Sequence, residues 1–254
     1  MPELTHPYEK FAYAYDQMMT NVDYVRWANY IDAIFRKCAF LPRKILDLAC
    51  GTGALTTLLA RQNYEMWGID RAEGMLAIAR RKAEQQELKI QFRRGDMLGF
   101  NLRQRFDAVV CTYDSINYAL SEEQLLNVFT CVSDHLKPSG LFIFDVTTER
   151  NITQHFHSQT FAENKENYSY IWKNMYSYRD KMCHTTLTFF IREGEFFRRF
   201  EEVHVQKMFE VNTVKKILGD SGYKMLGAYD MFTFNRWNRH SDRINFTAQK
   251  IETT

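Results

Sequence analysis

Apolar residues follow two alternating patterns along this chain, short strand-like runs and longer helical repeats. The strand-like runs cover residues 44–49, 64–69, 89–93, 106–112 and 141–146. The run at 106–112 is apolar almost throughout, which is typical of parallel strands buried on both faces. Helical spacing is found at residues 55–61, 74–87 and 121–136, between the runs. This alternation predicts an α/β fold with a doubly wound parallel sheet.

Both ends of the chain extend this pattern. Residues 23–35 carry apolar side chains at helical spacing and predict an amphipathic helix before the first strand. A helix at 211–221 is followed by strands at 223–231 and 243–250. No helix separates these last two strands, so we expect an antiparallel hairpin there. The sheet would then have seven strands.

The segment from Phe156 to Phe209 departs from this order. It holds 13 of the 38 aromatic residues, and its pattern changes to a period of two. Turn signals at residues 179–181 and 192–194 divide it, so we predict a meander of three antiparallel strands. Inserted after the strand at 141–146, it would emerge at the carboxyl edge of the sheet. It is either a cap over a substrate pocket or a sheet that enlarges the core or joins subunits.

A glycine turn follows the first strand, in the stretch Ile45 to Thr56. Such a turn opens the carboxyl edge of a parallel sheet to a ligand, and Asp70 follows at about the 20-residue interval expected of a ribose-binding carboxylate. Thr56 occupies the place of a third glycine, and Asp47 puts a carboxylate at the strand end, where it would repel a pyrophosphate and attract a cation. The loop therefore predicts a nucleoside cofactor without phosphates and disfavours an NAD-dependent oxidoreductase.

These motifs resemble those of class I S-adenosylmethionine-dependent methyltransferases. The resemblance is carried by Asp47-x-x-Cys50-Gly51-Thr52-Gly53, Asp70, Gly95-Asp96-Met97 and residues 136–140. It is closest to small-molecule enzymes that include the sugar-amine N,N-dimethyltransferases, which also open with a Phe-x-x-x-Tyr-Asp helix like residues 11–16. The resemblance implies a Rossmann-like methyltransferase sheet with an antiparallel β insertion, and S-adenosyl-L-methionine as cofactor. It implies a cytoplasmic enzyme that methylates the nitrogen or oxygen of a small molecule by in-line displacement.

The resemblance also implies a division of the chain. Residues 1–155 and 210–254 would form the cofactor-binding domain, with residues 1–40 as a helical lid and 156–209 as a substrate cap. Asp47 is expected to bind the amino group of the methionine moiety, Asp70 both ribose hydroxyls and Asp96 the adenine amino group. The full set of expected cofactor contacts is Tyr15, Trp27, Asp47, Ala49, Gly51, Thr52, Gly53, Asp70, Arg71, Met75, Asp96, Met97 and Tyr113. Arg26 is a weaker candidate partner for the cofactor carboxylate.

The acceptor is expected beside residues 111–118, which follow the strand at 106–112. The expected substrate residues are Tyr8, Asp114, Asn117, Tyr118, Trp172, Glu202 and His204, and the expected catalytic residues are Tyr15, Asn117 and His204. Glu202 and His204 share one face of an inserted strand with Phe200 and Gln206. If that face looks into the pocket, His204 is a candidate general base; if it looks outward, it is a solvated sheet face. His135, at a helix end, is assigned a structural role.

Composition limits the alternatives. A length of 254 residues suits one α/β domain with an insertion, and a net charge of +2 gives no basic face for nucleic acid. Five cysteines without a Cys-x-x-Cys pair indicate neither disulfides nor a metal site, and suit a cytosolic protein. No signal peptide or membrane span is indicated. A non-catalytic S-adenosylmethionine-binding module and a nucleic-acid methyltransferase stay as alternatives, and the pattern fits either a monomer or a homodimer.

Overall fold

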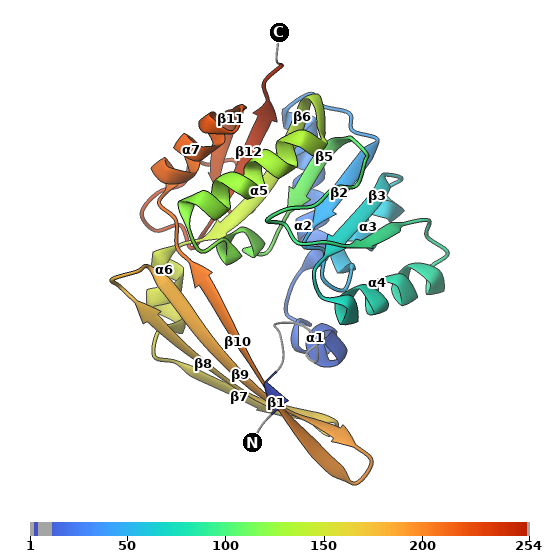
Figure 1. Cartoon of the computed structure of the whole chain (residues 1–254), viewed down its shortest axis with the longest axis vertical. Coiled ribbons are helices and arrows are strands. Elements are labelled where there is room, and N and C mark those ends of the chain that lie inside the picture. The colour runs from blue at the N-terminus through green and yellow to red at the C-terminus, as the bar shows by residue number, and fades with distance from the viewer. Residues whose placement is uncertain (1–2, 5–11, 253–254) are drawn as a thin grey trace.

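The computed structural model describes residues 3–4 and 12–252 (Figure 1). Its helices are α1 (Ala12–Met18), α2 (Tyr24–Lys37), α3 (Ala54–Arg61), α4 (Glu73–Gln85), α5 (Glu122–His135), α6 (Glu149–Asn151) and α7 (Val211–Asp220), with short turns η1 (Ser115–Tyr118) and η2 (Ile152–Phe156). Its strands are β1 (Glu3–Leu4), β2 (Lys44–Leu48), β3 (Glu65–Asp70), β4 (Gln91–Arg94), β5 (Phe106–Cys111), β6 (Leu136–Thr147), β7 (Thr160–Asn164), β8 (Tyr168–Ser177), β9 (Met182–Glu193), β10 (Phe196–Lys207), β11 (Tyr223–Asp230) and β12 (Arg243–Lys250).

The larger sheet has seven strands in the order β11-β12-β6-β5-β2-β3-β4. The pairs from β6 to β4 are parallel, whereas β12 is antiparallel to both β6 and β11. The predicted doubly wound sheet and its terminal antiparallel hairpin are therefore confirmed. Parallel strands all end at one edge, so the loops after β2, β3, β4 and β5 meet there.

Helices cover both faces of this sheet (Figure 1). The apolar sides of α5 and α7 pack on one face, against β-strand residues such as Val109, Phe142 and Phe246. On the other face α2 and α3 pack against Ile45, Val110 and Ile143. Asp23 begins α2 by accepting a hydrogen bond from the Arg26 amide (2.8 Å), and Ser121, where the helix predicted at 121–136 begins, caps α5. Residues 1–40 were expected to form a helical lid, but α2 within that range packs in the core.

The strand predicted at 141–146 begins earlier than expected. β6 starts at Leu136, directly after α5, and so includes residues 137–140, which separate that predicted strand from the helix predicted at 121–136. Phe106 pairs with Leu136 and Ala108 with Leu141, so residues 137–140 form an irregularity along the β5 pairing. Ser139 has a positive φ of 59° there.

A second sheet, of order β1-β10-β9-β8-β7, is built mainly from the insertion. The prediction of three inserted strands was wrong, since four are present. The missed strand β7 is mostly exposed and has no apolar alternation that would mark it in the sequence. In Figure 1 this sheet extends away from the larger one, and α1 lies beside it, below α4. Tyr15 and Met18 of α1 pack against its buried residues Leu187, Phe189 and Phe200.

Among residues 3–4 and 12–252, no helix has the length and apolar character needed to cross a membrane.

Candidate active site

A pocket opens at the carboxyl edge of the seven-stranded sheet. Its walls come from α1, the start of α2, the loops after β2, β3 and β4, and the segment after β5. The lining residues are Tyr15, Tyr24, Asp47, Ala49, Cys50, Gly51, Thr52, Ala54, Leu55, Asp70, Arg71, Met75, Gly95, Asp96, Met97, Leu98, Thr112, Tyr113, Ser115 and Tyr118. Most of the residues expected to contact the cofactor are thus brought together in one cavity.

The glycine loop reaches the pocket through an unusual backbone. Ala49, Gly51 and Gly53 all have positive φ, at 59°, 54° and 72°. Gly53 does not line the pocket. A Cβ on it would lie 3.0 Å from the Cβ of Ala79 and 3.2 Å from the Phe92 ring. Its lack of a side chain therefore permits the close packing of the loop on α4 and β4, and it acts on the pocket only through the loop.

Asp70 holds this loop against the end of β3. One carboxylate oxygen accepts a hydrogen bond from the Gly51 amide (2.9 Å), and the other accepts one from the Ala72 amide (2.9 Å). Burial raises the pKa of Asp70, and these backbone hydrogen bonds oppose the rise. A carboxylate oxygen can accept more than one hydrogen bond. Asp70 can therefore shape the loop and still accept from a ligand at the pocket wall.

Asp47 lies deeper in the pocket and is almost fully buried. The Thr56 hydroxyl donates to it at 2.6 Å, so the residue in place of a third glycine fixes the carboxylate. Burial raises the pKa of Asp47 to about 7, opposed by the Thr56 hydrogen bond and reinforced by the charge of Asp70. Within the described residues no cation compensates this carboxylate. A ligand cation placed here would favour its ionised form.

The helix α1 is fastened to the glycine loop. The Asp16 carboxylate accepts hydrogen bonds from the Thr52 hydroxyl (2.6 Å) and the Lys82 ammonium (2.8 Å). Lys82 belongs to α4, so one carboxylate joins three elements. Tyr15, the next residue along α1, lines the pocket. Burial raises the pKa of Tyr24 to about 12, and a hydrogen bond with Tyr15 opposes this rise. Together these residues make α1 a cover over one side of the cavity.

The segment after β5 turns sharply, with positive φ at Tyr113 (60°) and Asp114 (54°). Tyr113 lines the pocket, but Asp114 does not. Asp114 pairs with the buried Arg243 guanidinium at 2.6 Å and accepts a hydrogen bond from the Gln206 side chain at 2.7 Å. The predicted contact of Asp114 with substrate is not part of this arrangement; its carboxylate joins β12 and β10 to the pocket wall.

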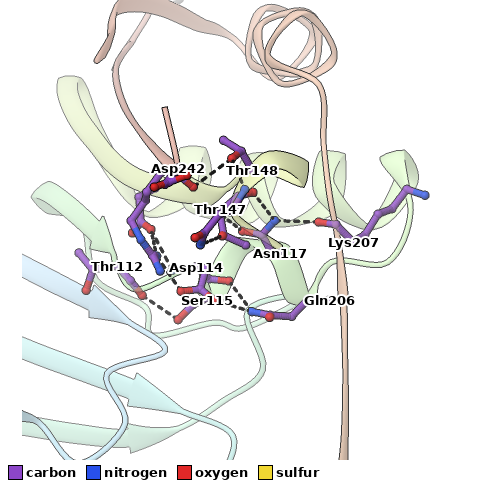
Figure 2. Close-up of polar contacts among 12 residues, drawn as sticks. Thr112, Asp114, Ser115, Asn117, Thr147, Thr148, Gln206, Lys207 and Asp242 are labelled. Carbon is purple, nitrogen blue, oxygen red and sulfur yellow. Dashed lines mark hydrogen bonds and ion pairs between the residues drawn. The ribbon is translucent and has the colours of Figure 1, made fainter. Parts of the chain in front are cut away.

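Asn117 connects the two points where the second sheet joins the larger one (Figure 2). Its amide nitrogen donates to the carbonyls of Thr147 (3.3 Å) and Lys207 (2.8 Å), and its oxygen accepts from the Thr147 amide (3.0 Å). Thr147 ends β6 and Lys207 ends β10. Asn117 is fully buried and does not line the pocket, so both of its amide hydrogens serve the fold. We therefore assign it a positioning role in place of the expected catalytic one.

The inserted strand β10 turns its predicted polar face inward. Phe200, Glu202 and His204 are all buried, whereas Val203 between them is 42% exposed. His204 Nδ1 lies 2.9 Å from the Tyr118 hydroxyl, and its Nε2 lies 3.2 Å from a Glu202 carboxylate oxygen. Tyr118 lines the pocket, but neither His204 nor Glu202 does. Glu202 and His204 are therefore connected to the cavity by hydrogen bonds that lead to Tyr118.

Other expected residues lie elsewhere. Trp27 is buried in the core beside Phe232 and does not line the pocket, because α2 packs on the sheet. Trp172 donates to Asn174 within the second sheet (2.7 Å). His135 accepts from the Leu102 amide (3.1 Å) and has the structural role assigned to it. Tyr8 lies outside the described residues. Arg26 lies over the Phe232 ring, 4.3 Å from its centre, and does not line the pocket.

Sequence reasoning missed several pocket residues. The pocket residues that the sequence did not predict to contact a ligand are Tyr24, Cys50, Ala54, Leu55, Gly95, Leu98, Thr112 and Ser115. Most are neighbours of motif residues, and a loop that wraps around a ligand presents consecutive residues to it. Tyr24 is the first residue of α2, and only its position after Asp23, the residue that begins the helix, could have drawn attention to it.

Comparison with known proteins assigns this geometry to a family. Residues 45–140 match a family model described as a methyltransferase domain. YqeM of Bacillus subtilis (strain 168), whose name places it among methyltransferases, is 35% identical over 97% of this chain and 98% of its own. The chain belongs to the S-adenosylmethionine-dependent methyltransferases.

Solved structures agree with this assignment. The crystal structure of an S-adenosylmethionine-dependent methyltransferase from Clostridium acetobutylicum ATCC 824 has a TM-score of 0.85 to this methyltransferase at 30% identity, covering 96% of this chain and 99% of that one. A sugar N-methyltransferase, KedS8 from Streptoalloteichus sp. ATCC 53650, has a TM-score of 0.78 at 20% identity, covering 94% and 93%. At that identity the likeness shows the fold alone.

The pocket fits the cofactor of this family. Its walls hold the carboxylates of Asp47, Asp70 and Asp96 and the guanidinium of Arg71. A cavity with more carboxylates than cations suits a ligand that carries positive charge, and the buried Asp47 gains the compensation that the described residues do not give it. S-adenosyl-L-methionine, which has an ammonium and a sulfonium group, supplies an activated methyl group when bound.

Proposed function

We propose that this methyltransferase transfers a methyl group to a nitrogen or oxygen atom of a small-molecule acceptor. The observation that carries the proposal is the position of Tyr118. Tyr118 lines the cofactor pocket, and its hydroxyl contacts His204, which comes from the buried face of the inserted sheet. The pocket and the insertion therefore share a wall, and an acceptor held there would lie beside the cofactor.

In this proposal the residues divide between cofactor and acceptor. Asp47 binds the ammonium of the methionine moiety, Asp70 the ribose hydroxyls and Asp96 the adenine amino group, while Tyr15 covers the reacting centre from α1. Residues 156–209 form the cap that excludes water and orients the acceptor. Such positioning is worth roughly 7–11 kcal/mol in well-oriented systems. A methyltransferase can therefore work with little further catalytic machinery.

Two observations support a small acceptor over a nucleic acid. The net charge of +2 is spread along the chain, whereas nucleic-acid enzymes carry a basic face. The similarly folded KedS8 is named as a sugar N-methyltransferase. The five free cysteines are in keeping with a reducing, cytoplasmic location.

The test is a labelling experiment. The purified protein is incubated with tritiated-methyl S-adenosylmethionine and, separately, with small-molecule, nucleic-acid and protein fractions of a bacterial extract. We expect label in the small-molecule fraction, and chromatography and mass spectrometry then identify the product. Label confined to nucleic acid would overturn the proposal. Tight binding of S-adenosylhomocysteine without labelling of any fraction would favour a non-catalytic binding module.

A further inference from the structure

Three buried or half-buried side chains form a hydrogen-bonded row that begins at the pocket wall. Tyr118 of η1 lines the pocket, His204 of β10 lies behind it, and Glu202 of the same strand lies behind His204. The joining distances are 2.9 Å from the Tyr118 hydroxyl to His204 Nδ1 and 3.2 Å from His204 Nε2 to the Glu202 carboxylate. Glu202 is completely buried and His204 is 7% exposed. The row therefore runs from the cavity into the interior of the second sheet.

The chemistry of these groups gives the row a direction. A carboxylate can only accept hydrogen bonds, so the Glu202 carboxylate selects the tautomer of His204 whose Nε2–H donates to it. In a neutral imidazole the other nitrogen then accepts, and the Tyr118 hydroxyl donates to Nδ1. Glu202 thus fixes the tautomer in which His204 can take a proton from Tyr118, as a carboxylate behind a histidine does in other catalytic systems.

We propose that Tyr118, His204 and Glu202 form a proton relay that accepts the proton released by the methyl acceptor. The inference rests on the proposed function and deepens it. It assigns the acceptor to the class of protic nucleophiles, an amine or a hydroxyl. Tyr118 is the residue of the relay that touches the acceptor, and His204 and Glu202 act through it.

The relay accounts for the proton and the electron pairs of the step. When the nitrogen or oxygen of the acceptor takes the methyl group, its lone pair forms the new bond to carbon. The bond from carbon to the sulfonium sulfur breaks with its electron pair on sulfur. The acceptor must also lose one proton. That proton passes to the Tyr118 oxygen as the Tyr118 proton passes to His204 Nδ1, which leaves a neutral tyrosine and an imidazolium paired with Glu202.

The surrounding charges are consistent with this direction. The Arg71 guanidinium lies 5.9 Å from the centre of the Tyr118 ring, on the pocket side, and would stabilise negative charge developing on the phenol. On β9 the residue opposite His204 is the uncharged Thr185. In the described contacts, Glu202 is the charged group that pairs with His204. Arg71 is the charged group that lies beside Tyr118.

The first test needs no acceptor. Histidine labelled with ¹⁵N reports the tautomer of His204 by NMR, and its signals are assigned by their loss in His204→Gln. We expect the Nε2–H tautomer in the native protein. We expect the population to shift toward Nδ1–H in Glu202→Gln, because the new amide can donate to Nε2. A native protein in the Nδ1–H form would overturn the relay whether or not the chain methylates a small molecule.

The second test measures transfer of tritiated methyl to the small-molecule fraction. Tyr118→Phe and Glu202→Gln are expected to lower the transfer rate at least ten-fold and to change its pH profile, with the affinity for S-adenosylhomocysteine within about two-fold of native. Thr185→Val, directly opposite His204, is the matched control for disturbance of the sheet and should keep native transfer. Transfer by Tyr118→Phe at the native rate would overturn the relay alone. Native protein that binds S-adenosylhomocysteine but labels nothing would overturn the proposed function, and the relay with it.

Discussion

Asp47 and Asp70 are both buried aspartates at strand ends, but they differ in the hydrogen-bond donors around them and therefore in role. Asp70 accepts two backbone hydrogen bonds and so fixes the loop that surrounds the ligand. Asp47 has one hydroxyl donor, from Thr56. Hydrogen bonds to the charged form stabilise it, whereas burial alone destabilises it. Asp47 is therefore the carboxylate whose charge state depends most on the ligand.

Asp47→Asn should weaken S-adenosylhomocysteine binding and remove its dependence on pH near neutrality. The pKa of Asp47 is raised by burial to about 7, so the native pocket holds this group partly protonated at pH 7. Binding of an ammonium ion favours the carboxylate, so native affinity should increase as the pH rises through 7, with release of protons. Calorimetry at pH 6 and 8, in buffers that differ in ionisation enthalpy, measures both effects. Equal affinity at the two pH values without proton release would contradict this role.

The same group makes a prediction about stability. A carboxyl group with a raised pKa in the folded state binds its proton more tightly when folded, so its contribution is full below about pH 4 and is lost as the pH rises through about 7. Asp47→Asn keeps the shape of the side chain without this loss. The melting temperature of Asp47→Asn minus that of the native protein should therefore be larger at pH 8 than at pH 5. Thermal unfolding of both proteins at the two pH values, without ligand, measures the difference, and a constant difference would refute it.

Asp70→Ala should weaken S-adenosylhomocysteine binding by roughly 1.5–3 kcal/mol, the usual value of hydrogen bonds to a charged group. The substitution removes the expected partner of the ribose hydroxyls and leaves the amides of Gly51 and Ala72 without their acceptor. Asp107→Ala is a matched control, because Asp107 also accepts from two backbone amides, those of Arg43 and Lys44, at the opposite edge of the sheet. Calorimetry should show native affinity for the control. A similar loss of affinity in Asp70→Ala and Asp107→Ala would show that general destabilisation of the fold, and not a lost ligand contact, weakens binding.

At the scale of elements, one partly buried cluster holds α1 beside the pocket. Asp16→Asn breaks its ion pair with Lys82 (2.7 Å) and weakens its hydrogen bond with Thr52. A partly exposed pair is worth roughly 0.2–1 kcal/mol, so S-adenosylhomocysteine should dissociate up to about five-fold faster, with little change in melting temperature. Glu73→Gln, which breaks the Arg80 pair on α4, is the control. Stopped-flow dissociation rates that agree for the native protein and Asp16→Asn would show that α1 does not retain the cofactor.

The elements of the larger sheet were predictable because each is specified locally. Buried parallel strands are apolar runs, and the start of α5 is marked by Ser121, whose hydroxyl accepts from the Gln124 amide. β7 carries no such local signal. Its five residues are mostly exposed and become a strand only by pairing with β8, through Phe161 and Trp172 for example.

The candidate site was predictable where a motif fixes the backbone, and less so where tertiary packing decides. Asp47, Gly51 and Asp70 line the pocket because a strand end and its turn determine their place. Asn117 looked like a ligand from its position after β5, but its amide is taken by carbonyls 30 and 90 residues away in the chain. No local pattern reports a contact of that kind.

For the whole molecule, the two sheets meet where the second one leaves and rejoins the first. The Asn117 amide nitrogen is within hydrogen-bond distance of carbonyls at both points, on Thr147 and Lys207. The chain therefore leaves and returns at nearly one place, so the second sheet could be removed without opening the first. Among the residues that the structure describes, those that line the pocket all fall within 15–118. Phe209, just after the return, is buried in the core of the larger sheet, whereas Met208 packs with Ile152 and with Tyr176 and Cys183 of the inserted segment.

Replacing residues 149–206 by a short glycine-serine linker should therefore separate cofactor binding from methyl transfer. Affinity for S-adenosylhomocysteine should fall by no more than a few-fold, since the change removes none of the described pocket residues. It does deprive Tyr15 and Met18 of their packing against the second sheet, Tyr118 of its contact with His204 and Asp114 of its hydrogen bond from Gln206. Methyl transfer to the small-molecule fraction should be lost, because nothing would then hold the acceptor or exclude water. Calorimetry and the labelling assay measure the two quantities on one preparation. Transfer at the native rate would show that the insertion is no substrate cap, and loss of binding would show that α1 covers the pocket only when the second sheet supports it.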